Sequence, residues 1–158
     1  MSFLKTTLGK IIATFLISMV PVIELRGAIP YAKASGLNVW LAVAISIVGN
    51  LVPVPFIIIY IKKIFRFIRR HFPKFDGLIT KLEKRAEEKA TTVEKYEFWG
   101  LFILVAIPLP GTGAWTGALV AAMLDMRLKR ALPAIAAGVV AAGAVVGLAT
   151  MGVITLLI

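Results

Sequence analysis

A carboxylate and a guanidinium lie two residues apart inside a long apolar stretch near the start of the chain. They are Glu24 and Arg26, in the sequence Val-Pro-Val-Ile-Glu-Leu-Arg-Gly-Ala-Ile-Pro of residues 20–30. Ionisable groups inside a bilayer are costly, and they often bind a substrate, an ion or a proton. Glu24 could therefore couple to protons or coordinate a cation, and Arg26 could hold a phosphate through two parallel hydrogen bonds.

Both side chains also have structural interpretations. Glu24 and Arg26 could form an ion pair with each other, or Glu24 could cap the free amides at the end of a half-helix. We favour the functional interpretation for Glu24, because charges inside bilayers rarely persist without a role. For Arg26 the two interpretations stay open.

Two further polar breaks interrupt apolar sequence, in Gly-Asn-Leu-Val-Pro-Val-Pro from residue 49 and in Ala-Ile-Pro-Leu-Pro-Gly-Thr-Gly-Ala-Trp-Thr-Gly from residue 106. We expect Asn50 to satisfy backbone carbonyls freed by the nearby prolines, with a bond to substrate or to a hairpin tip as the alternative. Threonines in the second break should cap local backbone, and the amides around its glycines could bind an anion. The candidate substrate- or ion-binding residues are Glu24, Arg26, Pro30, Asn50, Pro108, Pro110, Gly111, Thr112, Gly113 and Thr116.

The composition is typical of an integral membrane protein. Of the 158 residues 59% are hydrophobic, against about 45–50% in soluble domains, and the mean hydropathy is +0.92. The net charge is +10, and because the positive residues flank apolar runs we expect contact with anionic lipid headgroups rather than nucleic acid. The chain has no cysteine, and its one histidine, His71, lies in a basic cluster. We therefore expect no metal or cofactor site, and no residue constellation indicates an enzyme.

Two apolar stretches are broken in the middle, which predicts re-entrant helical hairpins. Residues 11–38 form the first, with Glu24 and Arg26 near its tip, because prolines and a glycine interrupt residues 20–30. Residues 98–126 form the second, with its tip at 108–116. Two prolines and two glycines fall within six residues there, and they cost a helix about 3 and about 1 kcal/mol each.

The predicted spanning helices are residues 37–61, with a kink near Asn50, and residues 132–158, whose small residues suit close packing in a bilayer. Between the two halves, residues 62–97 contain eleven Lys/Arg and six Asp/Glu, a net charge of +5. The positive-inside rule places this linker in the cytoplasm. Its first part should form an amphipathic helix on the membrane surface that ends before Pro73, followed by a helix at 78–96.

The predicted fold class is therefore an all-α polytopic membrane protein with two re-entrant hairpins and two spanning helices. Residues 1–158 form a single membrane domain, made of a first half (1–61), the linker (62–97) and a second half (98–158). The hairpins open to opposite sides, which is the arrangement of inverted-topology repeats. A spanning first helix with a cytoplasmic N-terminus is the alternative, because Lys5 and Lys10 would otherwise lie outside.

Three motifs together resemble the small multidrug export family, which is similar to the wider DedA (VTT-domain) superfamily. They are Glu-Leu-Arg-Gly-Ala-Ile-Pro, Gly-Asn-Leu-Val-Pro-Val-Pro and Ile-Pro-Leu-Pro-Gly-Thr-Gly-Ala-Trp-Thr-Gly. The resemblance implies a multi-pass transporter in the inner (cytoplasmic) membrane of a prokaryote, with two facing re-entrant hairpins. Glu24 and Pro30 match the acidic residue and proline of the first DedA element. The arginine pair of the second element is missing, since Gly111 to Thr116 stand there.

The predicted function is a transporter of an amphipathic anionic lipid, such as a polyprenyl (undecaprenyl) phosphate, with proton coupling as an option. The alternatives are a proton-coupled exporter of small amphipathic cations and a non-transporting scaffold that dimerises through residues 132–158. The expected partners are membrane lipids, a small amphipathic or lipid substrate, protons or cations, and a second copy of the chain. An essential Arg26 with an anionic cargo would favour lipid transport, and an essential Glu24 alone with cationic drugs would favour export.

Overall fold

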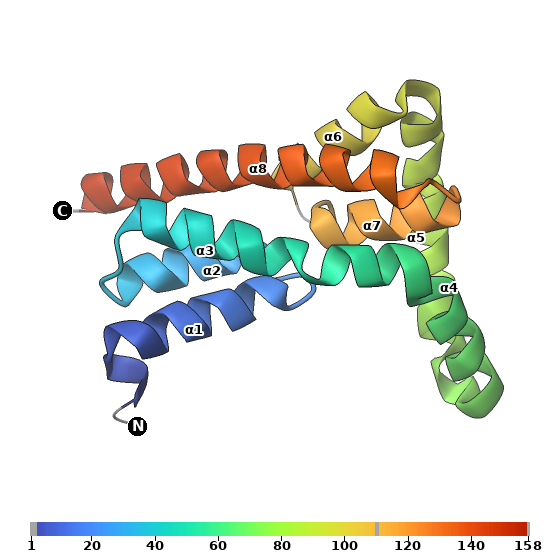
Figure 1. Ribbon diagram of the computed structural model, residues 1–158, viewed down its shortest axis with the longest axis horizontal. Coiled ribbons are helices and arrows are strands. Elements are labelled where there is room, and N and C mark those ends of the chain that lie inside the picture. The colour runs from blue at the N-terminus through green and yellow to red at the C-terminus, as the bar shows by residue number, and fades with distance from the viewer. Residues whose placement is uncertain (1–2, 110, 158) are drawn as a thin grey trace.

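The computed structural model describes residues 3–109 and 111–157, and within these residues all regular secondary structure is helical (Figure 1). The all-α part of the predicted fold class is confirmed. Two helices are long and apolar enough to cross a membrane: Val39–His71, which combines α3 and α4, and Leu128–Gly152 within α8. In chain order the elements are η1 (Phe3–Lys5), α1 (Thr7–Met19), α2 (Glu24–Ala34), α3 (Val39–Leu51), α4 (Pro53–His71), η2 (Pro73–Phe75), α5 (Asp76–Tyr96), α6 (Phe98–Ala106), α7 (Ala114–Met123) and α8 (Leu128–Leu157).

Helices α1 and α2 form a hairpin that turns back about halfway along the molecule (Figure 1). The turn occupies residues 20–23, and the backbone takes left-handed φ values of 75° at Val22 and 49° at Glu24. Side chains with a Cβ avoid this region unless their surroundings hold them there. Glu24 and Arg26 therefore lie in the first turn of α2, at the tip of the hairpin.

The predicted break at Pro30 is wrong, because α2 continues through this residue to Ala34. A proline inside a helix removes one backbone hydrogen bond, here the one to the carbonyl of Arg26. Burial of the apolar face of α2 offsets this cost. Gly27 also has helical backbone, and it is needed for space, since a Cβ there would lie 2.4 Å from Cγ2 of Ile23. The fully buried side chains of α2 are Leu25, Ala28, Ile29 and Ala32.

Helices α3 and α4 follow one another directly, with a turn only at Val52, whose backbone is itself helical (φ −55°, ψ −48°). The kink predicted near Asn50 remains a prediction. Pro53 and Pro55 lie in the first turn of α4, where a helix needs no amide donor. Helix α4 continues to His71, beyond the predicted end of the spanning helix at residue 61, and it turns away from the long axis in its second half (Figure 1).

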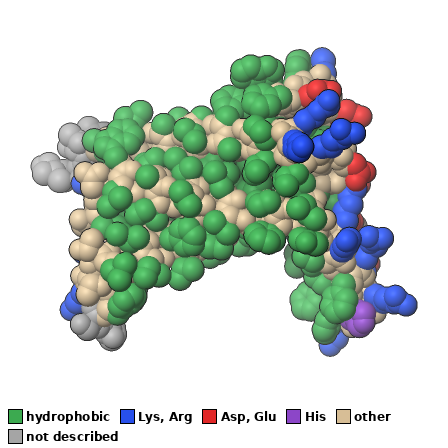
Figure 2. All heavy atoms as spheres, viewed as in Figure 1, with side chains coloured by type: hydrophobic (Ala, Val, Ile, Leu, Met, Phe, Trp, Pro, Cys, Tyr) green, Lys and Arg blue, Asp and Glu red, His purple; other side chains and the backbone are tan. Residues whose placement is uncertain are grey.

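The second half of α4, together with η2 and α5, lies across one end of the molecule, and both chain termini lie at the other end (Figure 1). Figure 2 shows Lys and Arg side chains gathered at the α4–α5 end and hydrophobic side chains over the middle. Arg69 joins α4 to α5 through ion pairs with Asp76 (2.8 Å) and Glu83 (2.6 Å). The predicted amphipathic helix and second linker helix are thus both present, as the end of α4 and as α5.

Helices α6 and α7 form a second hairpin, joined by a loop at residues 107–113. Helix α8 runs the full length of the molecule and packs against α2, α3 and α6 (Figure 1). A Cβ at Gly138 would lie 2.7 Å from Cβ of Val105, and one at Gly147 would lie 2.8 Å from Cγ2 of Val43. The predicted close packing of small residues is confirmed, and within one chain it joins α8 to α6 and α3.

Candidate functional site

The side chain of Glu24 extends from the first hairpin to the N-terminus of α7 in the second. The residue is 3% exposed, and its Oε1 accepts a hydrogen bond from the backbone N–H of Trp115 at 3.0 Å. The backbone N–H of Ala114 and the side chain of Asn50 also hydrogen-bond to the carboxylate. The first amides of a helix lack partners within it, and the helix dipole favours a negative charge there. Glu24 thus caps a helix that lies 91 residues further along the chain.

Gly113, the residue before α7, makes room for this carboxylate. A Cβ at Gly113 would lie 2.2 Å from Oε2 of Glu24, and the backbone has φ 117° and ψ −172°. Only glycine adopts this conformation readily. The sequence predicts that amides near Gly111–Gly113 could bind an anion, and at α7 the carboxylate of the protein itself occupies this position.

The guanidinium of Arg26 holds the loop of the second hairpin. Its Nη1 donates to the carbonyl of Leu109, and its Nη2 donates to Oγ1 of Thr112 at 2.8 Å and to the carbonyl of Ile107 at 3.5 Å. The Thr112 hydroxyl also lies 2.7 Å from the carbonyl oxygens of Ile107 and Leu109, which is the local capping predicted for it. Among the described residues no ion pair joins Glu24 to Arg26, so each side chain binds the opposite hairpin instead of its neighbour.

Asn50 is 1% exposed, and its side chain hydrogen-bonds to the carboxylate of Glu24. This is the bond to a hairpin tip expected as the alternative to satisfying carbonyls freed by the prolines. Oδ1 of Asn50 has no hydrogen-bond partner among the described residues. The same holds for Oγ of Ser46, which is fully buried one turn earlier on the same face of α3. Sequence analysis missed Ser46, although a polar pair at i and i+4 in an apolar helix was a signal for it.

A small void lies beside these groups, lined by Glu24, Arg26, Asn50 and Gly113 together with apolar residues of α6 and α8. It has no room for a water molecule. Asn50, which lines this void, is therefore not in contact with a solvent-filled space here.

On its other side Arg26 faces a groove of about 400 Å³ between α2, the 107–113 loop and α8. Pro30 and Pro108 line this groove, and Arg26 is the only charged residue among the described residues that line it. The remaining lining residues are Val145, Val146, Ala149 and Thr150.

The other predicted site residues lie apart from the Glu24 group. Gly111 is exposed with φ 77°, and its carbonyl accepts a hydrogen bond from Nζ of Lys89 in α5 at 2.7 Å. Thr116 lies in the first turn of α7, and its side chain makes no hydrogen bond within the described part of the chain. Pro110 lies outside the described residues. Nowhere in the described ranges do three or more His, Asp or Glu side chains form a group that could hold a metal ion.

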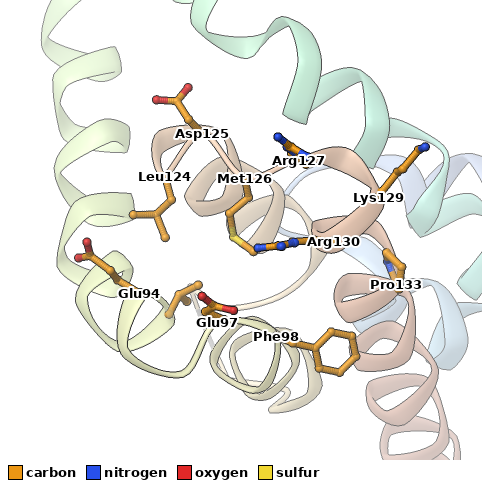
Figure 3. A pocket seen from close by; sticks show the side chains of 11 residues that line it. Glu94, Glu97, Phe98, Leu124, Asp125, Met126, Arg127, Lys129, Arg130 and Pro133 are labelled. Atoms are coloured by element: carbon orange, nitrogen blue, oxygen red, sulfur yellow. The ribbon is translucent and has the colours of Figure 1, made fainter.

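A second pocket, of about 690 Å³, lies at the charged end, between the α5–α6 corner and the start of α8 (Figure 3). Glu94 and Glu97 line one side, and Arg130 extends into the pocket from the other (Figure 3). These charges are all exposed, and none belongs to the predicted site. Asp125 at the rim forms an exposed ion pair with Lys62 at 2.7 Å. The pocket is thus part of the charged surface. It is separate from the contact of Glu24 and Arg26 with the 107–113 loop and the start of α7, which we call the hairpin junction.

Comparison with protein families gives one match. The model of the family described as "Putative small multi-drug export protein" matches residues 24–145, which begin at Glu24 and include the tip of the second hairpin. This match confirms the resemblance inferred from the three sequence motifs. Searches of curated proteins and of solved structures gave no match.

Proposed function

Because the chain belongs to the small multi-drug export family, we propose that it exports small amphipathic cations across a membrane in exchange for protons, with Glu24 as the exchanging group. The two long apolar helices and the family together indicate a membrane location. The identity of the cargo and the role of Glu24 are both proposals.

One observation carries the proposal: Glu24 is the only acidic side chain that is buried among the described residues, and it joins the two hairpins. A proton or a cationic cargo bound to this carboxylate would cancel the charge that the amides of α7 stabilise. The contact between the hairpins would then weaken. Binding and release at Glu24 would thus be coupled to opening of the contact between the two hairpins. An exchanger requires such coupling between ligand binding and a conformational change.

We further propose that the α1–α2 and α6–α7 hairpins are re-entrant in the membrane and related by an inverted repeat. Support comes from Figure 1, where the first hairpin opens towards the end with the termini and the second opens towards the charged end. The charge of residues 62–97 favours a cytoplasmic location for that end. The Glu24–α7 contact would then lie near the middle of the bilayer, where transporter sites between inverted repeats are usually found.

The test is export of a lipophilic dye cation from proteoliposomes with an imposed pH gradient. Wild-type protein should move the dye when the gradient is present, and Glu24→Gln should not, because an amide keeps the shape but does not exchange a proton. Glu87→Gln on exposed α5 is the matched control and should behave as wild type. Dye movement that is equal in Glu24→Gln and wild type, or absent in wild type, would contradict the proposal.

A second candidate function rests on a different observation. Among the described residues that line the apolar groove beside α8, Arg26 is the only charged one, and it would attract an anionic headgroup and repel a cation. The corresponding cargo is an amphipathic anionic lipid such as a polyprenyl phosphate. The same proteoliposomes test it with a fluorescent polyprenyl-phosphate analogue. Accelerated flipping that Arg26→Lys keeps in part and Arg26→Ala loses would favour the lipid over the cation, and no flipping by wild type would exclude it.

A further inference from the structure

An apolar groove of about 670 Å³ follows helix α4 from Pro53 to Phe67, over the bend towards the charged end (Figure 1). Its lining residues in α4 recur every three or four positions, as one face of a helix does, and Trp115 of α7 completes the wall. Four large apolar side chains in the groove are 46–61% exposed, namely Phe56, Tyr60, Ile64 and Phe67. An apolar surface of this kind is typical of a site that lipid or protein covers.

One edge of the groove is positively charged. Lys63 is the only charged residue among the described residues that line it, and its Nζ lies 5.9 Å from the centre of the Tyr60 ring. Arg66 and Arg70 follow three and seven positions later, on the same side of α4 as Lys63. Within the described part of the chain none of these three cations forms an ion pair. Helix α4 itself contains no Asp or Glu, so this edge attracts a negative charge.

From these observations we infer that the groove is a binding site for an anionic phospholipid. The acyl chains lie along α4 against Trp115, and the phosphate lies at Lys63, Arg66 and Arg70. From Pro53 to Phe67 the helix rises by roughly 21 Å, which exceeds the roughly 15 Å of hydrocarbon in one leaflet of a bilayer. The groove is therefore long enough for the chains of a membrane lipid.

The charge of the edge selects this occupant over two others. A neutral phospholipid would cover the apolar wall but would leave the three cations without a partner. A second copy of the chain, packed here by two-fold symmetry, would place its own basic edge against this one. Only an occupant that is apolar along most of its length and negative at one end matches both features.

Trp115 connects this groove to the hairpin junction. Its Nε1 donates a hydrogen bond to the carbonyl of Met19 in the first hairpin at 3.1 Å, and its backbone N–H donates to Glu24. A lipid in the groove therefore contacts a residue that binds the first hairpin in two places. The site is distinct from the proposed exchange at Glu24 and does not depend on it. It also narrows the general expectation of headgroup contacts along the basic linker to one place.

The experiment uses Trp115 as the reporter. Trp40→Phe and Trp99→Phe replace the other two tryptophans, which are 51% and 64% exposed. The full chain is reconstituted in phosphatidylcholine bilayers with a fraction of either phosphatidylglycerol or phosphatidylcholine brominated on its acyl chains, because bromine quenches nearby tryptophans. Brominated phosphatidylglycerol should quench Trp115 with an apparent affinity about tenfold or more above that of brominated phosphatidylcholine.

Lys63→Gln should lower this preference by about fivefold, the effect of one cation near a membrane surface. Lys95→Gln is the matched control and should leave it unchanged, because Lys95 also lies over a tyrosine ring, at 5.3 Å from that of Tyr96, but does not line the groove. Equal quenching by the two lipids, or an equal loss in the two variants, would overturn the site. Absence of quenching by either lipid would overturn it too, because another occupant such as a second copy would then cover Trp115.

The tryptophan substitutions could disturb the fold, so lipid binding is also measured on the unsubstituted chain. Native mass spectrometry of the protein in micelles with equal amounts of phosphatidylglycerol and phosphatidylcholine should show a complex with one phosphatidylglycerol as the main lipid-bound species. Lys63→Gln should reduce this complex, and Lys95→Gln should not. Equal binding of both lipids would contradict the site. Neither readout involves transport, so failure of the proposed exchange and failure of this site are distinguishable.

Discussion

Gly113→Ala tests whether Glu24 and α7 are joined in the way described. The backbone of Gly113, at φ 117° and ψ −172°, lies in a region where alanine is strained by about 1–3 kcal/mol. The added Cβ would also lie 2.2 Å from Oε2 of Glu24, so the carboxylate must leave the amides of α7. A lost hydrogen bond to a charged group costs about 1.5–3 kcal/mol. We expect the free energy of unfolding to fall by roughly 3–6 kcal/mol in total.

The assay is reversible unfolding in mixed detergent micelles, followed by tryptophan fluorescence. Gly77→Ala is the matched control, because no atom lies within 4 Å of a Cβ built at Gly77 in helix α5. Alanine there should be neutral or stabilising by up to about 1 kcal/mol. The difference in unfolding free energy between the two variants therefore reports on the contact between Gly113 and Glu24. It does not reflect the general effect of replacing glycine with alanine in this protein.

A double-mutant cycle separates the backbone strain at Gly113 from the lost hydrogen bonds of Glu24. In a Glu24→Ala background no carboxylate opposes the new Cβ, so Gly113→Ala should cost only the backbone strain of about 1–3 kcal/mol. The coupling between the two positions should be at least about 1 kcal/mol. The reasoning is refuted if Gly113→Ala costs the same in both backgrounds, or no more than Gly77→Ala in the wild type.

Three further substitutions test other contacts. Arg26→Ala should raise the hydrogen-exchange rate of the backbone amides of the 107–113 loop by about tenfold or more. Arg26→Lys should raise this rate by less, because lysine keeps the charge but lacks the forked donor. An unchanged exchange rate would mean that other contacts hold the loop. The Lys62–Asp125 pair has side chains 41% and 84% exposed, so an alanine double-mutant cycle should give a coupling of about 0.5 kcal/mol or less, and a value above about 1 would contradict this. Gly138→Ala should lower the free energy of unfolding by about 1–3 kcal/mol, because its Cβ would meet α6, whereas Gly152→Ala, in open space, should change little. Equal effects of the two would argue against close packing of α8 on α6.

The positions where the helices end could be predicted because local chemistry determines them. Prolines, glycines and polar residues placed the first turn near Glu24 and the loop before Ala114. The exception is Pro30, where burial of the apolar face of α2 outweighs the local preference of proline. The same reasoning explains the end of α4 before Pro73.

The sequence predicted that Glu24 could cap a half-helix, and the structure shows such a cap at α7. Which helix Glu24 caps, and which groups Arg26 binds, could not be predicted. Glu24 and Arg26 are neighbours in sequence, so an ion pair between them was the simplest structural hypothesis. Their actual partners, the amides of α7 and the carbonyls of the 107–113 loop, lie more than 80 residues away in sequence. Nothing in the spacing of residues says which helix end a carboxylate will reach, since that depends on how the hairpins pack. For Asn50 the sequence offered a bond to a hairpin tip only as the alternative, and the Asn50 side chain bonds to Glu24 at that tip.

The 107–113 loop of the second hairpin is held to the rest of the molecule largely through main-chain carbonyls. Arg26 contacts the carbonyls of Ile107 and Leu109, and Lys89 contacts the carbonyl of Gly111. Every residue type supplies the same carbonyl, and the side chains of Ile107 and Leu109 are exposed. Mutations at these two positions can therefore accumulate without loosening the loop, which makes it a place where new specificities can evolve on an unchanged scaffold.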